Sequence, residues 1–158
     1  MRAVFSVLAL AATSCVMPPP ASERVTDAAR ELNLAARFGR LDVALELTDK
    51  PLRTAFIERR ARWGKEIRVL DVELSGFSMP SVDRAQIEVE YAWARVDEGT
   101  LRTTRIAQEW RDPGGGFRLV RERRIAGDLG LFGEAIASDA RAPSSAARDV
   151  QFETKTIR

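Results

Sequence analysis

The spacing of apolar residues changes once along this chain, and that change limits the folds open to it. Before Gly64 the apolar residues recur every three or four positions, as in amphipathic helices. After Gly64 they alternate with polar residues, which is the period of strands with one buried face. A block of helices followed by a block of strands is typical of an α+β domain. We therefore expect about three helices packed on a curved antiparallel sheet of about four strands.

The helices are expected in the first block, at residues 23–38, 40–47 and 51–63. Gly39 and Gly64 supply stop signals after the first and third of them. Pro51 is suited to the first turn of the third helix, where the missing N–H costs nothing.

Four strands are expected in the second block, at residues 66–74, 85–96, 100–111 and 117–124. Within the first strand the alternation changes phase between Val69 and Leu70, which predicts a bulge or a strand buried on both faces. Residues 75–81, which include Gly76 and Pro80, are expected to form a loop.

The large apolar residues also predict how the last three strands pair. A two-residue turn that pairs Asp97 with Thr100, together with the pairing of Trp110 with Phe117, brings these residues to one face of the sheet. The expected inward face carries Ile87, Val89, Tyr91, Trp93, Thr104, Ile106, Gln108, Trp110, Phe117 and Leu119. That face would hold no carboxylate and no histidine, so it offers no acid–base pair.

Charged residues are expected on the outer face, where the same register pairs Arg105 with Glu122 and Glu109 with Arg118. Two basic clusters, at residues 59–62 and 121–124, are interpreted as solvated surface with local ion pairs. Contact with anionic lipid head groups is the alternative for both clusters.

The first fifteen residues have the layout of an export signal. Arg2 is followed by an uncharged run over residues 3–14, which is too short to remain as a membrane-spanning helix. The small residues Ala12, Thr13 and Ser14 lead into Cys15, the one cysteine of the chain.

This stretch resembles the lipobox signal of bacterial lipoproteins. The resemblance implies that residues 1–14 are removed, that Cys15 carries acyl chains such as palmitate, and that the protein is anchored in the cell envelope. Val16, in place of the aspartate that retains such proteins at the inner membrane, implies an outer-membrane anchor facing the periplasm. Residues 15–22 then form a proline-rich tether. A plain secretory signal with a stray or buried cysteine is the alternative.

Composition excludes several classes of function. Lys and Arg number 25 against 23 Asp and Glu, and Arg2 leaves with the signal, so the mature chain is nearly neutral. A nucleic-acid partner, which needs a basic face, is therefore not expected. The absence of histidine removes the commonest general base and zinc ligand, so we expect no metal site and no cofactor.

The helix-then-strand order and the glycine-rich turn in residues 108–120 resemble the NTF2-like fold, in which a curved sheet wraps around helices to form a cone. The resemblance covers about residues 23–124 and implies one domain over 23–127. It also implies a possible pocket inside the cone, lined here by Tyr91, Trp93, Thr104, Gln108 and Trp110. Core polar groups with satisfied hydrogen bonds are the alternative for these five, and a simpler three-helix-plus-meander domain is the alternative fold.

Residues 128–158 are expected to be a C-terminal extension, flexible in part because residues 139–149 are rich in Ala, Ser and Arg. Residues 150–157 alternate again, which predicts either an added edge strand or a frayed terminus.

Three functions remain open at this point. The first is a lipid-anchored, non-enzymatic module that binds another envelope component. The second is a carrier of a small apolar ligand in the cone. The third is an NTF2-like enzyme, which would need a carboxylate such as Asp42 or Asp71 beside Tyr91.

Overall fold

The computed structural model describes residues 18–135, so the signal sequence, Cys15 and the predictions for residues 136–158 lie outside the described residues. The elements in chain order are α1 (Ala21–Arg37), α2 (Leu41–Glu46), η1 (Lys50–Leu52), α3 (Arg53–Arg59), β1 (Ile67–Ser81), β2 (Arg84–Arg95), β3 (Leu101–Arg111) and β4 (Arg118–Gly127).

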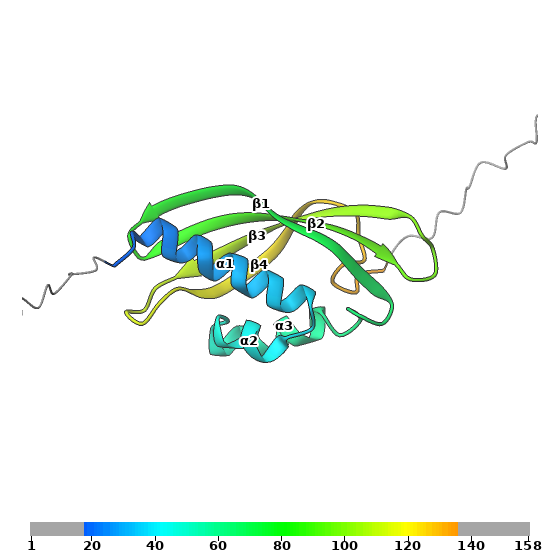
Figure 1. The fold of residues 1–158 in the computed structure, drawn as a ribbon, viewed down its shortest axis with the longest axis horizontal. Helices are drawn as coiled ribbons and strands as arrows, with labels where there is room; N and C mark the ends of the chain where they lie inside the picture. Colours follow the sequence, from blue (N-terminus) through cyan, green and yellow to red (C-terminus); the bar gives the residue numbers. More distant parts are fainter. Residues whose placement is uncertain (1–17, 136–158) are drawn as a thin grey trace, which may run out of the picture.

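The strands form one antiparallel sheet in the order β1-β2-β3-β4, and the helices lie together on one side of it (Figure 1). The expected α+β class, with about three helices and four strands, is confirmed. The sheet curves over the helices but does not close, so β1 and β4 are edge strands.

The first helix forms close to its predicted limits because its apolar residues share one face. Val25, Ala29, Leu32 and Ala36 are all buried beneath the sheet. The helix follows directly from Pro20, whose extended backbone has φ −60° and ψ 155°. The third helix is shorter than predicted: Pro51 belongs to the 3-10 turn η1, and α3 ends at Arg59.

The first strand is longer than predicted, and the loop expected at residues 75–81 is wrong. β1 continues through these residues because Gly76 sits at a bulge opposite Glu88, and a proline at position 80 is tolerated near the end of an edge strand. The irregularity predicted next to Val69 is confirmed as a register shift between Val69 and Asp71.

The predicted strand pairs are wrong by two residues, although the predicted faces are right. Tyr91 lies opposite Thr104, and Trp110 lies opposite Leu119. Both connections are longer than the expected turns, and the Asp112 carboxylate accepts backbone hydrogen bonds across the second one at 2.8 and 3.0 Å. A shift of two keeps every side chain on its own face, because the strand period is two.

The part of β4 beyond Val120 does change face, and this affects its charged residues. A bulge at Glu109/Trp110 lets β4 gain a residue, and Glu122 turns inward with 3% of its surface exposed. The predicted outer pair of Arg105 with Glu122 is therefore wrong. Arg105 pairs instead with Glu90 across the sheet at 2.9 Å.

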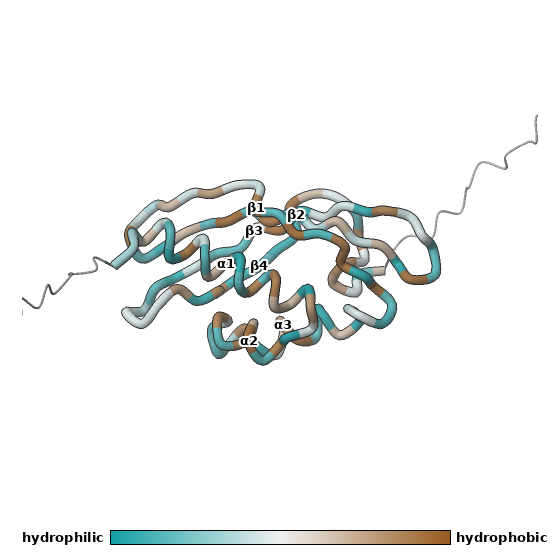
Figure 2. The backbone as a smooth tube through the Cα atoms, viewed as in Figure 1, coloured by the Kyte–Doolittle hydropathy of each residue, from teal (hydrophilic) through white to brown (hydrophobic). Residues whose placement is uncertain are grey.

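The core lies between the helices and the concave face of the sheet. Apolar and polar residues alternate along the strands (Figure 2), and the inward ones meet α1 and α3. The largest fully buried side chains include Trp93, Trp110, Tyr91, Phe56, Leu32, Ile87, Ile106 and Leu119. The segment after β4 adds Leu131, which is fully buried and whose carbonyl accepts a bond from Trp63 Nε1 at 2.8 Å. Between residues 18 and 135, no helix has the length and apolar run needed to cross a bilayer.

Candidate functional site

An amide on α1 connects three elements inside the cone. Asn33 Oδ1 accepts hydrogen bonds from the Tyr91 hydroxyl and from Gln108 Nε2, the latter at 2.9 Å. Asn33 Nδ2 donates to Gln108 Oε1 at 3.1 Å and to the Ala29 carbonyl at 2.7 Å. These bonds satisfy the buried amide and tie α1 to β2 and β3.

A second set of polar contacts joins β2, β3 and the segment after β4. Trp93 Nε1 donates to Thr104 Oγ1 at 2.8 Å, and Thr104 Oγ1 donates to the Asp128 carbonyl at 2.8 Å. The indole and the hydroxyl are thereby satisfied without any outside group.

A buried ion pair joins the end of α3 to β4. Arg60 Nη1 and Nη2 donate to the two Glu122 carboxylate oxygens at 2.7 and 2.8 Å, and both side chains are fully buried. The Arg60 guanidinium also lies 3.5 Å from the centre of the Phe56 ring, with Trp63 and Phe132 at 5.0 and 5.2 Å. This arrangement combines a two-pronged salt bridge with cation–π contacts.

The buried pair corrects two expectations from the sequence. The inward face does carry a carboxylate, Glu122, and Arg60 is not part of a solvated basic cluster. Burial by itself would lower the pKa of Arg60, but the Glu122 charge and its hydrogen bonds together outweigh burial and raise it. Because its carboxylate is engaged by an arginine, Glu122 is not available as a general base.

The five residues predicted to line a pocket are all buried: Tyr91, Trp93, Thr104, Gln108 and Trp110. Four of them bond to one another or to Asn33 and Asp128, as described above. The fifth, Trp110, has an indole N–H that meets no hydrogen-bond partner among the described residues. Asp42 and Asp71, the carboxylates considered for an enzyme, are both exposed. Among residues 18–135, no three metal-ligating side chains lie close enough to share an ion.

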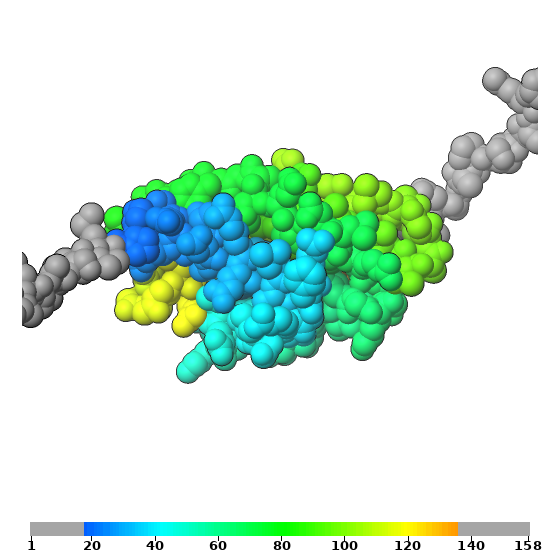
Figure 3. Space-filling view, in the orientation of Figure 1, coloured from blue at the N-terminus to red at the C-terminus, as the bar shows by residue number. Residues whose placement is uncertain are grey.

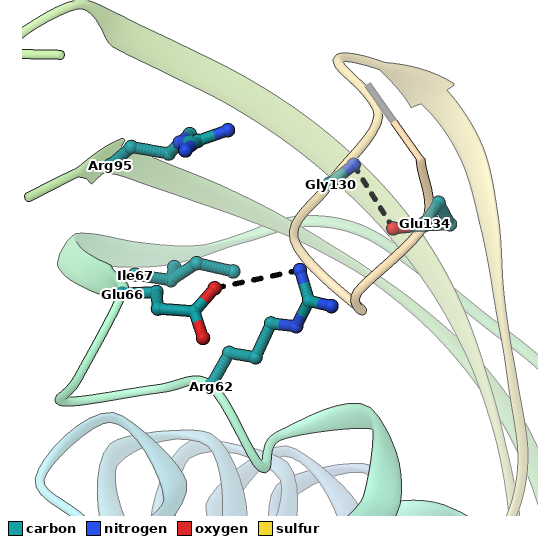
Figure 4. Close-up of a pocket in the computed structure, with 6 residues that line it drawn as sticks. All are labelled: Arg62, Glu66, Ile67, Arg95, Gly130 and Glu134. Atoms are coloured by element: carbon teal, nitrogen blue, oxygen red, sulfur yellow. Dashed lines mark hydrogen bonds and ion pairs between the residues drawn. The ribbon is translucent and has the colours of Figure 1, made fainter. Parts of the chain in front are cut away.

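A small hollow at the far end of the sheet is lined by Arg62, Glu66, Ile67, Arg95, Gly130 and Glu134 (Figure 4). Its volume of about 60 Å³ is room for little more than one or two water molecules. Its charges also have partners, since Arg62 meets Glu66 at 3.5 Å and Arg95 meets Asp97 at 2.8 Å. This hollow is not a convincing ligand site.

A larger opening runs between α1 and the edge strand β1, which lie side by side on one face of the molecule (Figure 3). A hollow of about 390 Å³ is lined by Arg30, Asn33, Leu34, Val72, Glu73 and Leu74. A second one of about 240 Å³ shares Arg30 and Leu74 with the first and extends it to Phe77. We call this continuous surface the α1–β1 groove.

The groove exposes large apolar side chains along its length. Two of them line it directly, Leu34 on α1 and Phe77 on β1, which are 44% and 50% exposed. Phe38 and Leu70, which are 68% and 42% exposed, lie beside Arg37, whose guanidinium stacks on the Phe38 ring and bonds to the Leu70 carbonyl. Val72 and Leu74 form its half-buried floor. Neighbouring exposed apolar residues of this size mark interaction surfaces more often than scattered ones do.

Polar features on the outer side of β1 complement the apolar groove. In the sheet β1 pairs only with β2, and beyond the contacts of Ile67 with residues 62–64 and of Leu70 with Arg37 the backbone groups on its other side face no strand. Asp71, Glu73, Glu88 and Glu90 line the outer face of β1 and β2 beside that edge, and we call them the acidic strip. Within the described residues, Glu73 and Glu88 form no ion pair. Glu73 lies directly opposite Glu90, which is paired with Arg105.

Comparison with known proteins gives a fold. No protein-family model matches the chain, and no curated protein matches it. An NTF2-like protein from Cytophaga hutchinsonii superimposes with a TM-score of 0.52 at 13% identity, over 66% of this chain and 96% of that one. The fold is NTF2-like.

Two other solved structures superimpose on the chain with similar TM-scores. A SEC-C motif-containing protein from Rhodopseudomonas palustris has a TM-score of 0.56 at 18% identity, over 68% of this chain and 83% of that one. The intermembrane-space region of the chloroplast protein ARC6 has a TM-score of 0.50 at 12% identity, over 69% and 99%. At these identities the NTF2-like likeness concerns the fold alone.

One feature of the sequence could have revealed the hydrogen bonds around Asn33. The sequence offers little that would reveal the buried Glu122 or the α1–β1 groove. Asn33 interrupts the apolar stripe of α1 between Ala29 and Ala36, and a polar residue on a buried face needs a partner. Glu122 could not be placed without the bulge in β4. The groove depends on where α1 crosses the sheet, which no local pattern reveals.

Removing one partner of the buried ion pair should destabilise the NTF2-like domain strongly. We expect Glu122→Gln to lower the free energy of unfolding by about 3–5 kcal/mol, because it leaves the Arg60 charge buried and unpaired. Arg60→Met should cost less than this, because Arg59 Nη1 still lies 3.4 Å from Glu122 Oε1. The double variant Arg60→Met/Glu122→Leu should lose less than the sum of the two. Urea unfolding measures this, with Arg105→Met at the exposed Arg105–Glu90 pair as a control that should cost less than about 1 kcal/mol. Single variants that lose no more free energy of unfolding than the Arg105→Met control would contradict this prediction.

Tyr91 should stay neutral far into the alkaline range. Burial, reinforced by the Glu122 charge and only partly opposed by Arg60, raises its pKa to about 12. An unfolded tyrosine titrates near pH 10, so the stability linked to Tyr91 is present below about pH 10 and lost as pH rises toward 12. Tyr91 is the single tyrosine of the chain, so phenolate absorbance reports it directly. Phenolate appearing near pH 10 while circular dichroism still shows the native fold would refute the buried assignment.

Proposed function

We propose that this chain is an envelope lipoprotein, anchored through Cys15, whose domain is a non-enzymatic module that binds another envelope protein. The observation that carries the proposal is the α1–β1 groove, where apolar side chains lie exposed beside an open sheet edge. The lipobox-like sequence before Cys15 and the proline run after it support the anchor.

The groove favours one kind of occupant, an extended segment that adds a strand to β1. Edge strands bind such segments through backbone hydrogen bonds, and alternate side chains then point to opposite faces. Side chains pointing inward would cover Leu34 and Phe77, while those pointing outward would meet the acidic strip. The partner segment should therefore alternate apolar with basic residues.

Among the described residues, the inside of the cone offers no unpaired acid or base, and this supports binding over catalysis. Glu122 is engaged by Arg60, and the chain contains no histidine. A small apolar ligand inside the cone is the weaker alternative, because Tyr91 and Gln108 already bond to Asn33 there.

The anchor has a direct test in the native bacterium. A Cys15→Ser variant should move from the membrane fraction to the soluble fraction, because several acyl chains are needed for stable attachment. The matched control is Ser14→Ala, which keeps the cysteine and a small residue before it. A Cys15→Ser protein that stays with the membranes as the parent does would rule out the lipid anchor.

The groove is tested by charge placed within it. We expect Leu34→Asp/Phe77→Asp to lose a photo-crosslinked partner that the parent retains, because the carboxylates would have to be desolvated on binding. The control Val96→Asp/Leu101→Asp puts the same charges on exposed apolar positions at the β2–β3 connection. Both variants should keep the circular dichroism of the parent.

The identity of the crosslinked peptide decides between groove binding and a chance contact. A probe at Phe38 should capture a segment that alternates apolar with basic residues, and Glu73→Lys should weaken its capture several-fold. Equal capture by the groove variant and its control would overturn the proposed site, whatever protein is captured.

A further inference from the structure

Three elements meet at the end of the domain where α1 begins (Figure 1). Arg24, in the first turns of α1, pairs with Asp112 at the end of β3, with Nη1 3.1 Å from Oδ2. The Asp112 backbone N–H donates to the carbonyl of Asp83, in the β1–β2 turn, at 2.9 Å. We call this end of the domain, formed by the start of α1, the β1–β2 turn and the β3–β4 loop, the proximal end.

A row of three arginines crosses the outer face of the sheet at the proximal end. Arg84 lies directly opposite Arg111, and Arg111 lies directly opposite Arg118. Like charges in directly opposed positions repel, so this row is unfavourable for the isolated domain. Among the described residues, Arg111 and Arg118 have no ion-pair partner, and the Arg84 contact with Asp83 is long at 3.9 Å.

The carboxylates nearest to the row already have other hydrogen-bond or ion-pair partners. Asp112 binds Arg24 and the backbone N–H groups of Gly114 and Gly116, which hold its pKa below the usual range. Asp83 accepts a bond from the Ser81 hydroxyl at 2.7 Å, and this bond is the main cause that lowers its pKa.

The last nearby carboxylate, Glu109, meets Arg121 at 3.7 Å. The three arginines therefore face outward as a positive patch, and among these carboxylates only Asp83 lies within ion-pair distance of it, 3.9 Å from Arg84.

The surface around the row has room for an anionic group and an apolar contact beside it. A depression of about 200 Å³ has Arg84 and Arg111 among its lining residues. Val82, at the tip of the β1–β2 turn, is 81% exposed and is the most exposed large apolar residue of the described part of the chain. A basic patch next to a protruding apolar side chain is the usual composition of a surface that rests on an anionic bilayer.

Chain length places this patch near a membrane. Residues 16–20 alone separate Cys15 from Ala21, the first residue of α1. A fully extended chain of that length reaches about 20 Å, and the prolines at 18–20 keep it near that limit. The proximal end is thus the part of the domain closest to any bilayer that holds Cys15.

We infer that the proximal end is a membrane-docking surface, in which Arg84, Arg111 and Arg118 bind the phosphates of anionic phospholipids and Val82 enters the interface. The inference rests on the lipid anchor of the proposed function. It differs from the lipid contacts named as the alternative for residues 59–62 and 121–124, where Arg60 and Glu122 bind each other inside the domain.

A site-specific label on the lipidated protein tests the docking. With Cys15 acylated, Val82→Cys provides one free thiol for a polarity-sensitive dye, and Val96→Cys places the same dye at the β2–β3 connection. On vesicles that contain phosphatidylglycerol, the dye at position 82 should report an apolar environment and the dye at position 96 should report water. On phosphatidylcholine vesicles, or at molar salt, both dyes should report water.

The arginine row is tested by removing its charge. Each arginine near an anionic surface contributes a factor of about five to binding, so Arg84→Gln/Arg111→Gln/Arg118→Gln should lower the docked-to-undocked ratio on the order of 100-fold. The control Arg40→Gln/Arg68→Gln/Arg123→Gln removes the same charge from exposed positions elsewhere and should leave the ratio unchanged.

Each remaining outcome counts against the inference. A dye at position 82 that responds equally to both lipids, or a control variant that loses as much as the row variant, would overturn the docking surface. A protein that stays on neither kind of vesicle would overturn the anchor at Cys15 and the inference with it. A protein that stays on both while the dye at position 82 reports only water would overturn docking and leave the anchor intact.

Discussion

The position of the first helix depends on one buried amide. Asn33 uses both of its polar atoms inside the cone, and its partners belong to the two central strands. Any rotation or sliding of α1 would leave three buried polar side chains unpaired, at a cost of roughly 1–3 kcal/mol for each. The helix is therefore held against β1 and β2, with Asn33 bonded to Tyr91 on β2 and to Gln108 on β3. The α1–β1 groove exists because the inward side chains of the edge strand are left without a complete cover.

The buried Arg60–Glu122 pair has the corresponding role for the short helices. It ties the end of α3 to β4, and the parallel contact between residues 47–49 and Leu119 covers part of that edge. The β1 edge is covered in the same way only near its start, by a bridge between Trp63 and Ile67 and a bond from Arg37 to the Leu70 carbonyl, and the rest of that edge faces no strand. An NTF2-like sheet built in this way has one side on which a further strand can be added.

How far the sequence determined these results differs between features. Fold class and strand faces could be predicted, since they follow from a period of two that survives any even shift in register. The residue-by-residue pairing of the strands could not be predicted. It depends on the β3–β4 connection, which is held by bonds to the Asp112 side chain, and the alternation of apolar and polar residues carries no information about such bonds. Glu122 was placed on the wrong face for a related reason, since a single bulge inverts everything beyond it. The groove was beyond prediction because its walls come from elements whose relative position is set by Asn33.

Only five residues, three of them prolines, separate Cys15 from the first residue of α1, so the domain can move only a short distance away from Cys15. With that cysteine in a bilayer, the α1–β1 groove stays within about one domain diameter of the membrane surface. Encounters with a partner in the same leaflet then become a search in two dimensions, at a local concentration far above that of a freely diffusing protein. Modest affinity is enough under these conditions, and a shallow open groove suits partners that share the membrane surface.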